Sequence, residues 1–159
     1  FTLKKLDFWF YNCIIIKNKK MDNLKEYWKT SSCFYKKMGL DPSKDMKPLG
    51  DNALILNIAS ISKKFEAYEG IIHGGYVSTL LDSVGGITAL FFADKKFGKI
   101  ALTSSMKVEF KRPLSPLVES KVIGSVSALT ENGCLGEAKI YQKDNVVAQA
   151  IFSFRFKKP

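Results

Sequence analysis

The sequence predicts an α+β fold in which an antiparallel β-sheet wraps around a single buried helix. Within the twenty residues Gly74–Ala93, Asp82 is the only charged side chain. Apolar residues recur there at spacings of three and four, which indicates a helix that is apolar almost all round and therefore buried. Four segments after it alternate apolar and polar residues with period two, with short turns between them. Strands connected so briefly form an antiparallel sheet, and the helix is available to cover its apolar face.

One helix and one strand are expected before this central helix. Aromatic and apolar residues follow a helical spacing over Asp22–Lys37, which predicts an N-terminal helix. The segment Gly39–Asn52 is typical of a turn-rich connection. A strand is predicted over Ala53–Ile61, followed by a loop over Lys63–Gly70.

After the central helix, a short basic loop is expected over Asp94–Lys99 and then the four strands. The turn signals between the strands are RPLSP, ENG and KDN. The apolar positions predicted to face the core are Met106, Val108 and Phe110, then Val122, Val126 and Ala128, then Ala138 and Ile140, and finally Ala148, Ala150, Phe152, Phe154 and Phe156.

The composition is that of one globular domain, with 159 residues, 46% hydrophobic and 25% charged. No apolar run reaches the ~20 residues of a membrane helix, so membrane insertion is not expected. Cys13, Cys33 and Cys134 match no metal-ligand spacing and are interpreted as reduced thiols of an intracellular protein. The chain has one histidine, which excludes histidine-rich zinc sites. Neither a metal nor a cofactor is expected.

Of the net charge of +10, the +6 that lies outside residues 1–20 suggests an anionic partner, either nucleic acid or a small molecule that bears phosphates. Residues 1–20 supply +4 of this charge, and Met21 then opens a stretch that looks like an ordinary start. Three interpretations of residues 1–20 remain open: upstream sequence outside the fold, a basic targeting peptide, or a true N-terminal element.

The element order, together with the segments GIIHGGYVSTLLDSVGG and ALTSSMKVEFKRPL, resembles the hot-dog fold acyl-CoA thioesterases. The resemblance covers roughly residues 50–158. It is greatest to the eukaryotic thioesterase-superfamily members, whose motif is HGG, six residues and then Asp. On this basis residues 1–20 are an extension, 21–52 an N-terminal helix and connection, and 53–159 the hot-dog domain. The resemblance implies an acyl-CoA substrate, a homodimer that pairs again in some relatives, and a cytoplasmic or mitochondrial location.

Carried over by residue, the resemblance makes His73 and Gly74 the start of the hot-dog helix, with the Gly74 amide polarising the thioester carbonyl. Asp82 becomes the catalytic carboxylate, and Thr103 the hydroxyl partner near the attacking water. Some relatives have an asparagine six residues before the histidine as a second carbonyl contact. This chain has Ala67 there, which puts that contact in doubt.

The chemistry of thioester hydrolysis agrees with these roles but poses a problem of distance. Gly74 and Gly75 leave amides open at a helix N-terminus, where the helix dipole favours negative charge. Gly74 and Asp82 are eight residues apart, about 12 Å along a helix, so one carbonyl cannot touch both. Two antiparallel helices across a two-fold axis would solve this by placing the glycine end of one beside the aspartate of the other. Close approach of a neighbouring helix or strand would also explain the pair Gly85 and Gly86, which is costly within a helix.

Structural interpretations compete at each of these positions. Asp82 could be a buried acid that is hydrogen-bonded to Thr79 or Ser83. An anchoring role for His73 is favoured over proton transfer, although its ordinary pKa of about 6.5 permits both. Thr103 taken alone is no more than a packing residue.

Basic side chains could hold the phosphates of coenzyme A or could simply be solvated. The substrate-binding candidates are Gly75, Lys107, Lys111 and Arg112, with Lys95, Lys96 and Lys99 as further candidates. Other nucleophiles are disfavoured, because the chain has no G-x-S-x-G elbow and Cys134 is expected in a turn with no identifiable base.

Hydrolysis of acyl-CoA thioesters is the leading hypothesis, with Asp82 as general base or as nucleophile. An acyl-thioester hydratase or dehydratase would require a catalytic His73. A non-catalytic acyl-CoA-binding or protein-binding module would keep only the fold. Binding of nucleic acid is disfavoured, because the aromatic residues of the last strand alternate as a core face does.

Overall fold

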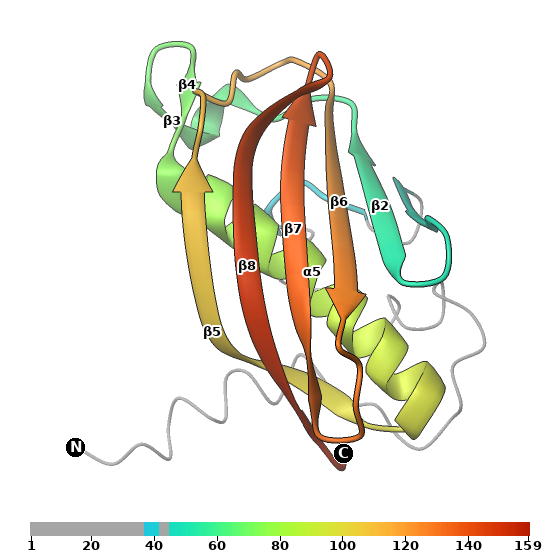
Figure 1. Cartoon of the computed structure of the whole chain (residues 1–159). Coiled ribbons are helices and arrows are strands. Elements are labelled where there is room, and N and C mark those ends of the chain that lie inside the picture. The colour runs from blue at the N-terminus through green and yellow to red at the C-terminus, as the bar shows by residue number, and fades with distance from the viewer. Residues whose placement is uncertain (1–36, 42–44) are drawn as a thin grey trace.

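A six-stranded antiparallel sheet curls around one long helix, α5, in the computed structural model (Figure 1). The structure describes residues 37–41 and 45–159. The extension 1–20 and all but the last residue of the N-terminal helix predicted over Asp22–Lys37 therefore lie outside the described residues. The strand order is β1-β2-β6-β7-β8-β5, and every pair of neighbours is antiparallel. The bounds are β1 Met46–Pro48, β2 Ala53–Ile58, α5 Gly74–Phe97, β5 Ile100–Phe110, β6 Ser120–Ser127, β7 Gly133–Gln142 and β8 Asn145–Lys157.

The central helix is confirmed, and it is longer than predicted. It continues through Phe97, so the loop predicted over Asp94–Lys99 is wrong. Lys95 and Lys96 lie in the last turn, where cations interact favourably with the helix dipole. The helix ends at Gly98, whose φ of 62° is in the left-handed region that glycine tolerates.

The four predicted strands are confirmed, and in β8 all five predicted core positions are buried. The edge strand β5 begins at Ile100, well before the alternation that predicted it. Its predicted core positions are less covered because β5 has a neighbour on one side only. Met106 and Val108 are partly buried, and Phe110 is 58% exposed. Ala128 lies beyond β6 with a φ of 48° and is exposed, so its predicted core position is wrong.

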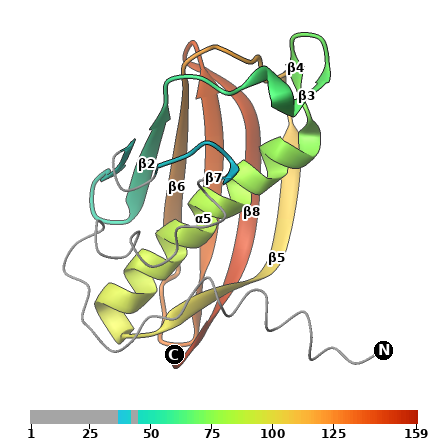
Figure 2. The same cartoon turned by 180° about the vertical axis from the view of Figure 1, so that it is seen from behind.

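Several short elements were not predicted. The connection predicted over Gly39–Asn52 contains the edge strand β1. The loop predicted over Lys63–Gly70 contains a 3₁₀ turn, Lys63–Phe65, and strand β3, Glu66–Tyr68, which forms a hairpin with β4, Ile71–Ile72. Figure 2 shows this hairpin at the N-terminal end of α5. These pieces have two or three residues each, too few for a period to be visible in the sequence.

The long helix is the core of the protein. Among the described residues, α5 is the one helix whose length and composition would allow it to cross a membrane, but 67% of its most apolar window is buried inside the protein. Its buried side chains pack against the inner face of the sheet together with those of β2, β6, β7 and β8. The apolar character of α5 is therefore explained by this packing.

Candidate active site

The N-terminus of α5 is held by the only histidine in the chain. His73 is the N-cap, and its Nδ1 accepts a hydrogen bond of 2.9 Å from the Gly75 N–H. Its own backbone N–H donates to the carbonyl of Phe65, which ties the helix to the turn before β3. The amide of Gly74 stands at the first helical position, where no acceptor lies one turn earlier. This arrangement matches the anchoring interpretation of His73 and leaves the Gly74 N–H available to a ligand. The Gly75 N–H, predicted to be open, is instead occupied by His73 Nδ1.

Asp82 and Thr103 are brought together from α5 and β5. Thr103 Oγ1 donates to Asp82 Oδ1 at 3.1 Å, across 21 positions of sequence. Burial raises the pKa of Asp82, and the Thr103 hydrogen bond opposes this by a smaller amount. The carboxylate is thus partly desolvated and has one hydroxyl donor beside it.

The structural alternatives for Asp82 are not observed. The hydroxyl of Thr79 donates instead to the Gly75 carbonyl at 2.7 Å. No hydrogen bond joins Asp82 to Ser83 within the part of the chain that the structure describes, and Ser83 is 7% exposed. The contact of Asp82 is therefore to the strand rather than to its own helix.

A bulge in β5 lies beside this contact. The register between β5 and β8 shifts between Thr103 and Ser105, so Ser104 has no partner in the ladder. Thr103 is paired with the buried Phe154, on the face of the sheet toward the helix, whereas Ser105 is paired with Ser153. Bulges often turn a side chain toward a site. Here the bulge marks the point where Thr103 meets Asp82.

The two halves of the predicted site stay apart within one protomer. Gly74 and Asp82 belong to one uninterrupted helix, so the separation of about 12 Å along the axis remains. The sequence did not predict the neighbour of Gly74, which is Phe110 at the end of β5. A Cβ built on Gly74 would lie 3.6 Å from two ring atoms of Phe110. An exposed aromatic ring thus stands beside the open amide.

The predicted substrate-binding cations do not converge on Asp82. Lys107 Nζ is 3.8 Å and Lys111 Nζ 3.7 Å from carboxylate oxygens of Glu109. Lys107 is paired with Ile151, whose side chain is on the outer face of the sheet. Arg112 follows β5 and donates from Nη1 to the Val146 carbonyl.

The other basic candidates lie near the C-terminal end of α5. Lys95 and Lys96 lie over the rings of Phe91 and Phe97, with Nζ 5.8 and 5.6 Å from the centroids. Lys99 Nζ donates at 2.9 Å to both the backbone carbonyl and the side chain of Glu131. These lysines are one helix length away from Gly74.

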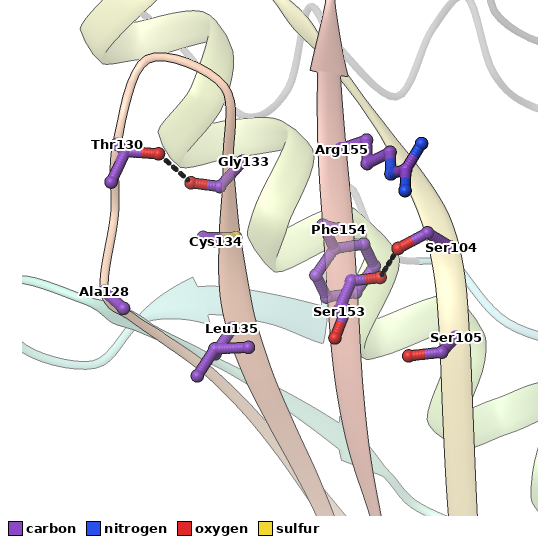
Figure 3. A pocket seen from close by; sticks show the side chains of 10 residues that line it. All are labelled: Ser104, Ser105, Ala128, Thr130, Gly133, Cys134, Leu135, Ser153, Phe154 and Arg155. Atoms are coloured by element: carbon purple, nitrogen blue, oxygen red, sulfur yellow. Dashed lines mark hydrogen bonds between the residues drawn. The ribbon is translucent and has the colours of Figure 1, made fainter.

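A hollow of about 540 Å³ lies elsewhere, across β5, β7 and β8 (Figure 3). Two of its hydroxyl groups are used within the protein, Ser104 donating to the Ser153 carbonyl and Thr130 to the Gly133 carbonyl. Its buried thiol, Cys134, is in strand β7 rather than in the predicted turn, and burial raises its pKa to about 11. The thiol is therefore protonated at neutral pH and is a poor nucleophile. The lining residues are Ser104, Ser105, Ala128, Thr130, Gly133, Cys134, Leu135, Ser153, Phe154 and Arg155.

Comparison with known families agrees with this fold. The sequence model described as the Thioesterase superfamily matches residues 69–149, which includes α5, Asp82 and Thr103. This is half of the chain, and the protein therefore belongs to the thioesterase superfamily. No match is found among curated protein sequences.

Solved structures confirm the hot-dog fold. A hypothetical thioesterase of Streptococcus pneumoniae, solved with coenzyme A, is 17% identical with a TM-score of 0.62, over 71% of this chain and 87% of that one. A Streptococcus mutans protein bound to acetyl-CoA is 19% identical with a TM-score of 0.63, over 72% and 88%. A conserved protein of Pseudomonas aeruginosa is 21% identical with a TM-score of 0.65, over 79% and 94%.

Proposed function

We propose that this protein hydrolyses acyl-CoA thioesters to a free acid and coenzyme A, at two equivalent sites shared between the subunits of a homodimer. The observation that supports this best is the contact between Asp82 and Thr103, a partly desolvated carboxylate with a hydroxyl donor 3.1 Å away. The superfamily match covers both residues, and two structures of the same fold hold coenzyme A or acetyl-CoA.

Asp82 supplies the base or the nucleophile. As a base, it removes a proton from a water whose oxygen bonds to the thioester carbon, after which the C–S bond breaks and the thiolate takes up a proton. A raised pKa makes the carboxylate a stronger proton acceptor. As a nucleophile, Asp82 forms an acyl anhydride that water then hydrolyses. In a single turnover in ¹⁸O-water, an unlabelled product acid with label in Asp82 identifies the anhydride route with attack of water on the Asp82 carboxyl carbon, because an oxygen of Asp82 then enters the product.

The carbonyl oxygen is proposed to bind the Gly74 N–H of the other subunit. An amide at a helix N-terminus favours the negative charge that develops on this oxygen. A single protomer cannot provide both groups, because its own Gly74 and Asp82 are about 12 Å apart along α5. Among the described strands β5 is at the edge of the sheet, and Phe110 is exposed beside Gly74, which supports an interface at this place.

The first test measures release of free thiol from a panel of acyl-CoAs. We expect wild type to release coenzyme A, and a folded, dimeric Asp82→Asn variant to lose ~10² or more in kcat/KM. Full activity of the variant would show that Asp82 is not a catalytic residue. Binding of acyl-CoA by wild type without any turnover would favour a non-catalytic module.

The second test asks whether the two groups come from different subunits. Gly74→Pro removes the N–H at the first helical position, where proline is well accepted. His73 already has the extended backbone that precedes a proline, with φ −58° and ψ 133°. Gly74→Ala is the matched control, because it keeps the N–H and adds a Cβ at an ordinary 3.6 Å from Phe110.

Each of Asp82→Asn and Gly74→Pro alone should be nearly inactive. After unfolding, mixing in equal amounts and refolding, half of the dimers are mixed and each has one intact site. The mixture should therefore recover about one quarter of the wild-type rate. No recovery, with mixed dimers demonstrated by mass, would show that each site lies within one subunit.

A further inference from the structure

The hollow across β5, β7 and β8 carries polar side chains on the face of the sheet that points away from α5 (Figure 3). In β8, Ser153 and Arg155 alternate with buried phenylalanines of the core, so the two polar side chains share the outer face. Ser153 is paired with Ser105 of β5, which places their hydroxyls next to each other. Thr103, on the other side of the register shift, contacts Asp82 on the helix side. The hollow and the candidate active site therefore lie on opposite faces of the sheet.

A glycine makes room beside the Arg155 side chain. Gly133 of β7 is its partner in the ladder, and a Cβ built on Gly133 would collide with the backbone carbonyl of Phe154. Because β7 and β8 approach so closely, a glycine is needed there, and the guanidinium has no side chain opposite it on that strand. On the other side of β8, the bulge at Ser104 interrupts the ladder with β5. The space of about 540 Å³ has room for a small anion.

The side chains that line the hollow are hydrogen-bond donors suited to an anion. Arg155 is the one charged residue among them, and a guanidinium presents a planar set of N–H groups that matches the oxygens of a phosphate. The hydroxyls of Ser105 and Ser153 add two further donors. Ser104 and Thr130 already donate to backbone carbonyls. Within the described residues, no hydrogen bond or ion pair occupies the side chains of Arg155, Ser105 and Ser153.

The surroundings of the hollow are positively charged. Lys157 follows Arg155 by two residues on the same face of β8, and Lys158 comes next. Glu131, in the turn before β7, is paired with Lys99 at 2.9 Å. The pKa of the Glu131 carboxyl is lowered by the hydrogen bond to Lys99, by the charge of Lys99 and, more weakly, by the charge of Lys158. An anion in the hollow would therefore meet an excess of positive charge.

We propose that the hollow binds a phosphate group, held by the guanidinium of Arg155 and the hydroxyls of Ser105 and Ser153. A free phosphate or phosphate monoester and a phosphate of coenzyme A share this chemistry, and the test distinguishes them. The binding uses none of the side chains on the helix side of the sheet, so it does not depend on the proposed hydrolysis.

The test titrates inorganic phosphate into ¹⁵N-labelled protein at constant ionic strength and follows the amide signals of Ser105 and Ser153 by NMR. We expect saturable shifts of these signals in wild type. In Arg155→Gln the Kd should rise by about 10-fold or more, because a charged hydrogen-bond donor is lost. In Ser153→Ala the Kd should rise by a smaller factor, about threefold, because a neutral hydroxyl is lost.

Lys157→Gln is the matched control, because it removes one positive charge from the same face of β8 outside the hollow. Its Kd for phosphate should stay within about twofold of wild type, since salt screens a charge that does not touch the ligand. Equal effects of Lys157→Gln and Arg155→Gln would show general attraction to a basic surface and would overturn the proposal. Absence of shifts at both serines in wild type would also overturn it.

Coenzyme A identifies the source of the phosphate. If it shifts the same signals and displaces inorganic phosphate, its own phosphates occupy the hollow. If inorganic phosphate stays bound at saturating coenzyme A, the hollow serves a separate phosphate ligand. Both results support the phosphate site, and both are measured without turnover. A failure of wild type to release thiol would therefore contradict the proposed function alone.

Discussion

At the residue scale, two opposing influences act on the Asp82 carboxyl. Burial raises its pKa, and the hydrogen bond from Thr103 stabilises the ionised form. The pairing of these two side chains could be expected from the family motif alone, since nothing in the spacing of a lone threonine indicates a partner 21 residues earlier. The structure supplies the contact, because the bulge in β5 sets Thr103 on the face of the sheet toward the helix.

Removal of the Thr103 hydroxyl should change the pH profile. In Thr103→Ala the pKa of Asp82 should rise further, because only the effect of burial remains. The ionised fraction at a given pH then falls, so the acid limb of kcat/KM should move to higher pH. Thr103→Ser should return it toward wild type. A uniform loss of rate with an unmoved acid limb would show that Thr103 only positions water.

His73 is expected to act through the helix. His73→Ala removes the acceptor for the Gly75 N–H and should lower the free energy of unfolding by about 1 kcal/mol, measured by urea titration. Asparagine is a good N-cap, so His73→Asn should restore most of this loss. Unchanged stability of both variants, together with a loss of activity of ~10² or more, would point to proton transfer instead.

At the scale of elements, strong periodicity predicted what the structure contains. The central helix and four strands are confirmed because each has enough residues to show a period of 3.6 or 2. The continuation of α5 through Phe97 was missed because the charged run Asp94–Lys96 is typical of both a loop and a solvated last turn. The β3–β4 hairpin was missed because its strands are held by contacts to the helix start and to Leu114, not by a local pattern.

The contrast between the two glycines of α5 can be measured as stability. Gly85→Ala places a methyl group against the ring of Phe152, which is 1% exposed. Overpacking should outweigh the gain in helix propensity and lower the free energy of unfolding by about 1–2 kcal/mol. Gly86→Ala is the matched control and should raise it by up to ~1 kcal/mol, because a Cβ built on Gly86 would have no atom of the described residues within 4 Å. Equal effects at the two positions would contradict the assigned surroundings.

At the scale of the whole molecule, the sequence predicts a site that needs groups from two chains, whereas the structure describes one protomer. The distance between Gly74 and Asp82 follows from helix geometry, so the spacing of the two residues in the sequence is enough to predict the need for a second chain. The partners of the lysines could not be predicted. The alternation of Met106, Val108 and Phe110 already puts Lys107 on the outer side of the sheet, but the ion pairs of Lys107 and Lys111 with Glu109 leave no mark in the residue pattern.

The separation of Gly74 and Asp82 along α5 determines how the activity should depend on the concentration of the protein. If one site needs two chains, a chain without a partner is inert. Below the dissociation constant of the dimer, the rate should then grow with the square of the total protein concentration, by mass action. Dilution of the wild-type protein in a thiol-release assay, followed alongside its mass in solution, measures this. A rate that stays proportional to concentration while the protein becomes monomeric would contradict it. When the total concentration is below the dissociation constant of the dimer, a twofold decrease in the protein lowers its activity about fourfold.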